Sequence, residues 1–106
     1  MWVTYNRGGV NYATGAIVSG LGTIGAFNAV QAIPGANAGA FGDIAVGPNG
    51  EVIVAFGPHL ATTDVLVSID PDGLGPQTFT PAIAAASTNV PGFDYIPAAP
   101  NWGIDS

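Results

Sequence analysis

Glycine and proline interrupt this chain so often that it leaves no room for a long helix. The longest stretch without either residue is His59–Asp70, only twelve residues. Its valine, isoleucine and threonine side chains favour strand, because branched side chains suit a pleated sheet. The chain is 48% hydrophobic and only 8% charged, which is not the composition of a disordered segment. The sequence therefore predicts a single all-β domain.

Strand-like segments and turns recur in the same order in the two halves of the chain. The alternating segment Trp2–Asn6 matches Ile53–Gly57, and each runs into a turn rich in glycine or proline. Three further matches follow in order: Ala16–Ser19 with Val65–Ser68, Phe27–Ala32 with Phe79–Ala84, and Ile33–Gly35 with Val90–Gly92. A repeat of about 50 residues built from four short strands has the size of a propeller blade.

The best-defined hairpin is centred on Gly47–Gly50. Pro48 sets φ at the first central position of this turn, and Gly50 supplies the positive φ that returns the chain to a strand. The expected strands of this unit are Asp43–Val46, Val52–Phe56, Asp64–Ile69 and Thr78–Ala84. Helix propensity favours a helix at Ala82–Ser87, but its place in the repeat favours a strand. We therefore expect two four-stranded antiparallel blades: residues 1–40, which lack the first strand, and residues 41–106, which include the start of the next blade.

The turn that follows the third expected strand carries a family resemblance. Blades of sialidase-like propellers with bacterial neuraminidase (Asp-box) repeats have a Ser-x-Asp-x-Gly-x-Thr-Trp turn between their third and fourth strands. This chain resembles them, with Phe in place of Trp and the motif spread over twelve residues, in Ser68, Asp70, Gly73, Thr78 and Phe79. The resemblance implies a structural turn, in which a short carboxylate accepts backbone N–H groups.

Paired carboxylates on a glycine turn are also possible calcium ligands. Asp70 and Asp72 supply only two such groups, and the ligand spacing of an EF-hand is not met. The sequence therefore favours a solvated turn, with no metal and no cofactor.

Catalysis, as the resemblance implies it, needs an arginine cluster, a tyrosine nucleophile with a glutamate partner, and an aspartic acid. Arg7 is the only lysine or arginine, and its simplest interpretation is a surface residue after the first strand. His59 is the only imidazole, and no triad can be built around it from strand spacing alone. We expect Tyr5, Tyr12 and Tyr95 to pack as strand or loop aromatics and assign no catalytic residue. A fragment of a sialidase-like glycoside hydrolase stays an alternative.

A second alternative comes from the G-x-G-x-x-G spacing of Gly20, Gly22 and Gly25. In a dinucleotide-binding fold, such glycines let a pyrophosphate approach the N-terminus of a helix. Only eight residues, Ala26–Ile33, separate this motif from Pro34, which is short for a crossover helix. A small nucleotide-binding α/β module is thus the weaker hypothesis.

Charge limits the partners that the chain can have. Its formal net charge of -6 repels phosphate backbones and anionic lipids, so we expect no nucleic acid and no membrane. Residues 8–42 are uncharged, but their glycines, Pro34 and polar amides are unlike a membrane span. No signal-peptide pattern follows Met1, and only the resemblance implies an extracellular location.

Taken together, these patterns predict a non-catalytic propeller module that assembles with copies of itself into a closed ring. Sialidase-like rings commonly have six blades, so three copies would complete one. The missing first strand would come from Trp102–Ser106 of a neighbouring copy by strand addition. The expected binding residues, for a glycan or a protein, are Tyr95, Trp102 and Arg7, because aromatics with few charges suit sugar faces.

Overall fold

The computed structural model describes residues 1–37, 39–58 and 63–88 of the chain. All regular structure in these ranges is antiparallel β-sheet, in sheets of three, two and four strands, and none of it is helical. The prediction of an all-β fold is therefore confirmed. Within these ranges no helix could cross a membrane.

The largest sheet is a four-stranded meander of consecutive strands, as the turn pattern predicted. Its order follows the chain: β6 (Gly39–Val46), β7 (Val52–Pro58), β8 (Thr63–Asp70) and β9 (Ile83–Thr88). The turn between β6 and β7 has Gly50 at φ 88°, and the Gly47 N–H donates to the Glu51 carbonyl at 2.8 Å. This is the positive φ expected at Gly50.

The predicted position of the fourth strand, Thr78–Ala84, is wrong by several residues. The strand begins at Ile83, because the segment before it is held against β8 by side-chain and backbone bonds. The Thr80 N–H donates to the Ile69 carbonyl at 2.9 Å, and the Ser68 hydroxyl donates to the Thr80 carbonyl at 2.5 Å. Pro81 has no N–H to continue a ladder. The alanine-rich stretch is a strand, as the repeat predicted and propensity did not.

The second sheet has three strands in the order β1 (Trp2–Arg7), β2 (Val10–Gly15) and β5 (Gln31–Asn37). Gly8 and Gly9, at φ 61° and 83°, form the two-residue turn between β1 and β2. Such a turn needs two positive φ values, which glycine adopts without strain. The sequence repeat matched Ala16–Ser19 with Val65–Ser68, but this glycine pair starts the strand that follows β1 earlier, at Val10.

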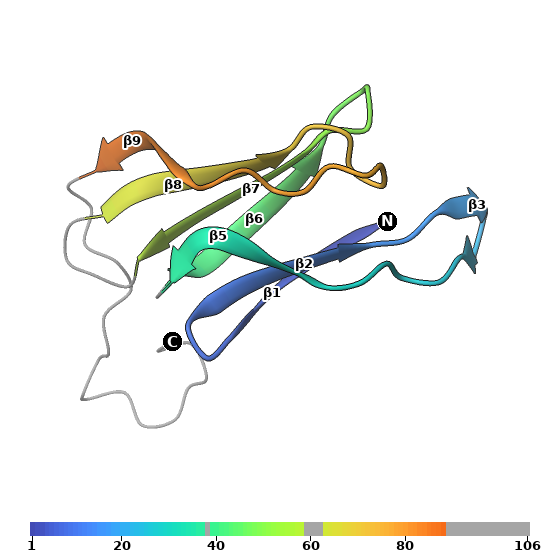
Figure 1. Ribbon diagram of the computed structural model, residues 1–106, viewed down its shortest axis with the longest axis horizontal. Helices are drawn as coiled ribbons and strands as arrows, with labels where there is room; N and C mark the ends of the chain where they lie inside the picture. The colour runs from blue at the N-terminus through green and yellow to red at the C-terminus, as the bar shows by residue number, and fades with distance from the viewer. Residues whose placement is uncertain (38, 59–62, 89–106) are drawn as a thin grey trace.

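A small hairpin, β3 (Val18–Gly20) with β4 (Thr23–Ile24), lies between β2 and β5 in the chain. It extends beyond the end of both larger sheets (Figure 1). Gly22 provides the positive φ of its turn, at 75°. The G-x-G-x-x-G motif is thus part of a hairpin. The described part of the chain has no helix after it, so the phosphate site of a dinucleotide-binding fold is not formed there.

The three-stranded and four-stranded sheets pack face to face, and the core lies between them (Figure 1). Trp2 and Phe79 meet across this space in a T-shaped contact, with ring centroids 6.0 Å apart. Gly15 makes room for the indole, since a Cβ there would lie 2.6 Å from Trp2 Cε2. The buried apolar side chains of this cluster are Ala13, Ile33, Val52, Val54, Phe56 and Phe79.

The two sheets share one hydrogen-bonding scheme at the strand before the last, which is β2 in one sheet and β8 in the other. The Thr14 hydroxyl of β2 donates to the Asn28 carbonyl at 2.8 Å, as the Ser68 hydroxyl of β8 does to the Thr80 carbonyl. The Asn28 N–H donates to the Gly15 carbonyl at 2.8 Å, the counterpart of the bond from Thr80 to β8. Thr14 and Asn28 therefore occupy the same places in one sheet as Ser68 and Thr80 do in the other.

Strand register extends this correspondence. Trp2 is opposite Gly15 in the first sheet, and Ile53 is opposite Ile69 in the second, so Trp2 and Ile53 are counterparts. Trp2 and Ile53 also begin the first pair of segments that the sequence repeat matched. The three-stranded sheet has no counterpart of β6 among the residues that the structure describes.

Candidate functional site

The turn after β8 is built around the carboxylate of Asp70, whose side chain is completely buried. Asp70 Oδ1 accepts the N–H of Asp72 at 3.2 Å and the N–H of Gly73 at 2.9 Å. Gly73 has φ 59°, and a Cβ on it would collide with the Gly50 carbonyl. The backbone therefore closes tightly around one carboxylate oxygen of Asp70, and only glycine fits at position 73.

The other residues singled out in this motif have different surroundings. The Asp72 carboxylate accepts the Gln77 N–H at 3.2 Å through both of its oxygens. Phe79 is 3% exposed and belongs to the core, whereas Thr78 is exposed. Thr80, which the sequence reasoning did not single out, accepts the Ile69 N–H through its hydroxyl at 3.3 Å.

Burial raises the pKa of the Asp70 carboxyl above its ordinary value of 3.8, and the negative charge of Asp72 adds to the rise. The N–H bonds from Asp72 and Gly73 oppose this effect. Asp70 Oδ2 has no hydrogen-bond partner among the described residues. In the same part of the chain, no three histidine, cysteine or acidic side chains cluster as metal ligands would. The arrangement is that of a structural turn.

Of the expected binding residues, the structure describes only Arg7. Arg7 is exposed at the end of β1, next to the glycine turn. Tyr95 and Trp102 lie outside the described residues, as does His59. Tyr5 and Tyr12 stack on one another with ring centroids 5.5 Å apart, at an interplanar angle of 20°.

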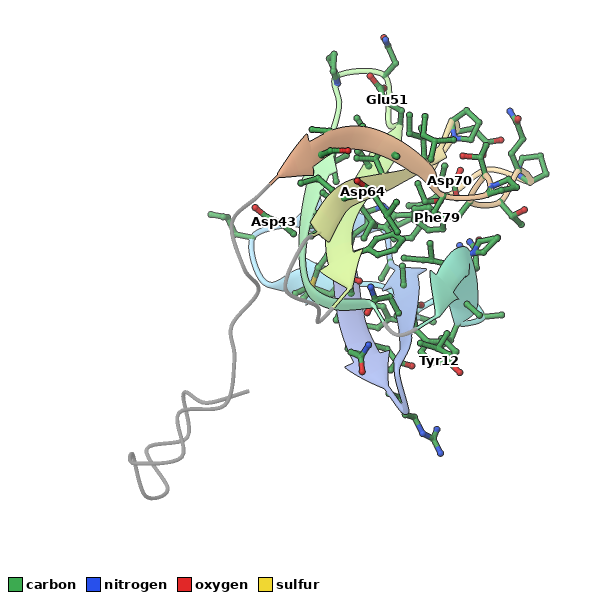
Figure 2. The ribbon with its side chains drawn as sticks, turned by 90° about the vertical axis from the view of Figure 1, so that its left-hand side faces the viewer. Tyr12, Asp43, Glu51, Asp64, Asp70 and Phe79 are labelled. Atoms are coloured by element: carbon green, nitrogen blue, oxygen red, sulfur yellow. The ribbon has the colours of Figure 1, made fainter. Side chains whose placement is uncertain are left out.

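The stacked tyrosines belong to the outward face of the three-stranded sheet. Side chains alternate along β1 and β2, so Val3, Tyr5 and Tyr12 lie on the side opposite the buried Ala13. Figure 2 shows Tyr12 on this side and Phe79 between the two sheets. Val3 is 37% exposed and Tyr5 is 40% exposed. We call Val3, Tyr5 and Tyr12 the tyrosine face.

The outward face of the four-stranded sheet is apolar as well. Val54 of β7 is buried against the other sheet, so its neighbour Ile53 points away and is 38% exposed. The ladder pairs Ile53 with Ile69 and Val67 with Ile83, which puts these side chains on the same side. We call the following residues the aliphatic face: Ile53, Val65, Val67, Ile69 and Ile83.

The sequence contains a signal for the aliphatic face that the sequence analysis did not consider. Strands with both faces covered are nearly continuous apolar runs, whereas strands with one wet face alternate. Val52–Phe56 and Val65–Val67 are continuous runs of this kind. These runs are typical of a sheet that is covered on both faces.

The chain was compared with protein-family models, with curated proteins and with solved structures, and none of the three comparisons found a match. The resemblance to sialidase-like propellers therefore stays an expectation from the sequence.

Proposed function

We propose that this chain is a non-catalytic propeller-type module that assembles with copies of itself into a closed ring. The observation that carries the proposal is a stack of two sheets with one hydrogen-bonding scheme, in which both end faces are apolar, partly exposed and without a further sheet of the described residues beside them. A sheet of a second copy can pack on either end face in the way that the two sheets pack on one another within one chain. Radial repetition of sheets around an axis is the propeller solution to such uncovered ends.

Three copies are the stoichiometry that we propose. Each copy contributes two sheets, and the six blades that the family resemblance implies would then close on themselves. The contact between copies is head-to-tail, since one copy offers its three-stranded end and the next its four-stranded end. Head-to-tail contacts form rings when the rotation between copies closes.

The free edge of β1 supports the same assembly. β1 pairs only with β2 among the described residues, while its counterpart β7 pairs with both β6 and β8. An uncovered edge presents unpaired N–H and carbonyl groups that accept another strand. We propose that Trp102–Ser106 of a second copy supplies this strand. That segment lies outside the described residues.

A non-catalytic role is supported by charge. A single chain cannot supply an arginine cluster for a substrate carboxylate, because Arg7 is its only lysine or arginine; a ring of three copies would repeat Arg7 once per copy. Glycan or protein binding through Tyr95, Trp102 and Arg7 would be an activity of the assembled ring, and a glycan array with the assembled protein would test it.

Light scattering on a size-exclusion column, with the chain loaded at several concentrations, tests the proposal. The expected mass is about three times the 10.5 kDa of one chain. A well-folded species that keeps the mass of one chain at every concentration would overturn it.

A further inference from the structure

We infer that the tyrosine face and Phe27 of one copy dock on the aliphatic face of a second copy, repeating contacts that the two sheets already make within one chain. The inference rests on the proposed function and adds to it the residues that meet.

The tyrosine face corresponds to a face that is buried within the chain. Val3 is opposite Thr14 in the first sheet, as Val54 is opposite Ser68 in the second, so Val3 and Val54 are counterparts. Tyr5 in turn corresponds to Phe56, two positions further along its strand. Val54 is 0% exposed and Phe56 is 2% exposed, because they pack on the three-stranded sheet. Their counterparts Val3 and Tyr5 are 37% and 40% exposed, because no further sheet of the described residues lies beside them.

The aliphatic face is the other half of the same contact. Trp2 lies on the inward side of the three-stranded sheet and packs on Phe79, and the counterpart of Trp2 is Ile53. Phe27 precedes Asn28 as Phe79 precedes Thr80, so Phe27 and Phe79 are counterparts as well. Phe27 is 46% exposed and Phe79 is 3% exposed. The phenyl ring of Phe27 therefore has its matching contact on Ile53 of a second copy.

The backbone gives a second, independent match. Within the chain, the Ala82 N–H donates to the Pro34 carbonyl at 3.0 Å, and a Cβ on Gly35 would lie 3.3 Å from Ala82 Cβ. Register makes Val30 the counterpart of Ala82, because Gln31 is opposite Ala13 as Ile83 is opposite Val67. Residues 33–36 lie between the partners of Tyr12 and Val10, as residues 85–86 lie between the partners of the corresponding Leu66 and Asp64. Ala86, opposite Val65 of the aliphatic face, is therefore at the place of the Gly35 segment. Val30 is 51% exposed. Val30 of one copy is therefore expected close to Ala86 of the next.

Charge favours this pairing over contact between two identical faces. Arg7 lies on the same side of β1 as Val3 and Tyr5, since side chains alternate along a strand. Asp43 is opposite Ala55, on the same side of the four-stranded sheet as Ile53, and is exposed. Docking the two different faces brings opposite charges toward one another, whereas pairing two tyrosine faces would bring two arginines together.

Engineered cysteines test the contact directly, because the chain has no cysteine of its own. Disulfides form where Cβ atoms lie about 3.5–4.5 Å apart. We expect V30C mixed with A86C to give a disulfide-linked dimer under mild oxidation. V30C mixed with Q77C, a cysteine in an exposed turn away from either face, is the control and should give none. Absence of the V30C–A86C product, or equal yield from the control mixture, would overturn the inference.

A matched pair of substitutions tests the same contact in solution. F27D places a charge in the proposed contact and should raise the dissociation constant of the assembly at least tenfold. L21D makes the same chemical change at an exposed tip residue outside both faces and should leave the constant within about twofold. If the unmodified chain assembles but F27D and L21D behave alike, the docking surface is wrong and the proposed function stands. If the unmodified chain never assembles, both fail.

Discussion

At the scale of single residues, Asp70 is the most informative position. One of its carboxylate oxygens accepts two backbone N–H groups and closes the turn, while the other is buried without a partner among the described residues. Burial of a carboxylate without full compensation disfavours its charged form. The turn thus depends on the shape and acceptor capacity of this side chain more than on its charge.

The raised pKa of Asp70 has a definite consequence for stability. The folded chain holds the Asp70 proton to higher pH than the unfolded chain does, so this group makes the free energy of unfolding decrease as pH rises from about 4 through its folded pKa. D70N keeps an acceptor for the two N–H groups and cannot ionise. We expect D70N to lose this part of the pH dependence in urea unfolding followed by fluorescence. An unchanged pH profile in D70N would contradict the role given to Asp70.

Gly73 is expected to tolerate no side chain. At φ 59° an L-residue is strained, and a Cβ there meets the Gly50 carbonyl. We expect G73A to lower the free energy of unfolding by about 2 kcal/mol or more. G50A, also at positive φ but with open space around its Cβ, is the control and should cost about 1–2 kcal/mol. Equal losses in the two variants, measured by urea unfolding, would show that the carbonyl contact is unimportant.

At the scale of elements, the sequence predicted the positions of turns better than the first and last residues of strands. The hairpin at Gly47–Gly50 followed from its proline and glycine, and the all-β class followed from the density of helix breakers. β2 was missed because the repeat was aligned on apolar runs, although Gly8–Gly9 is itself a hairpin signal. The late start of β9 depends on the bond from Ser68 to Thr80, which no local pattern contains.

The candidate site was harder to predict for a physical reason. Whether an apolar strand face is buried or outward depends on which sheet lies beside it, and strand periodicity does not contain that information. Tyr5 and Phe56 hold equivalent places in their sheets, yet one is 40% exposed and the other 2%. The difference in exposure between Tyr5 and Phe56 comes only from the arrangement of the two sheets.

The strand proposed to complete the three-stranded sheet can be tested by shortening the chain. We expect a chain without Trp102–Ser106 to fold but to assemble at least ~10-fold more weakly, because the edge of β1 then stays unpaired. Circular dichroism checks the fold and light scattering checks the assembly. G103P, which blocks strand pairing without shortening the chain, should act in the same direction. Assembly as tight as that of the full chain would place the added strand elsewhere.

At the scale of the whole molecule, apolar docking has to overcome charge. Each copy carries a formal net charge of -6, so copies repel one another at low ionic strength. We expect the assembly to tighten as salt is raised from about 20 mM to about 500 mM, since screening weakens this repulsion and leaves apolar burial intact. Sedimentation velocity at a fixed protein concentration measures it. Dissociation by salt would mean that ion pairs, such as one between Arg7 and Asp43, dominate the contact.

Closure is the central claim, because the same docking surfaces could also build an open stack. Native mass spectrometry of the unmodified chain over a range of concentrations separates the two. A closed ring predicts one assembled species of three copies whose stoichiometry does not change with concentration. A ladder of species that lengthens with concentration, or the single chain alone, would contradict the account.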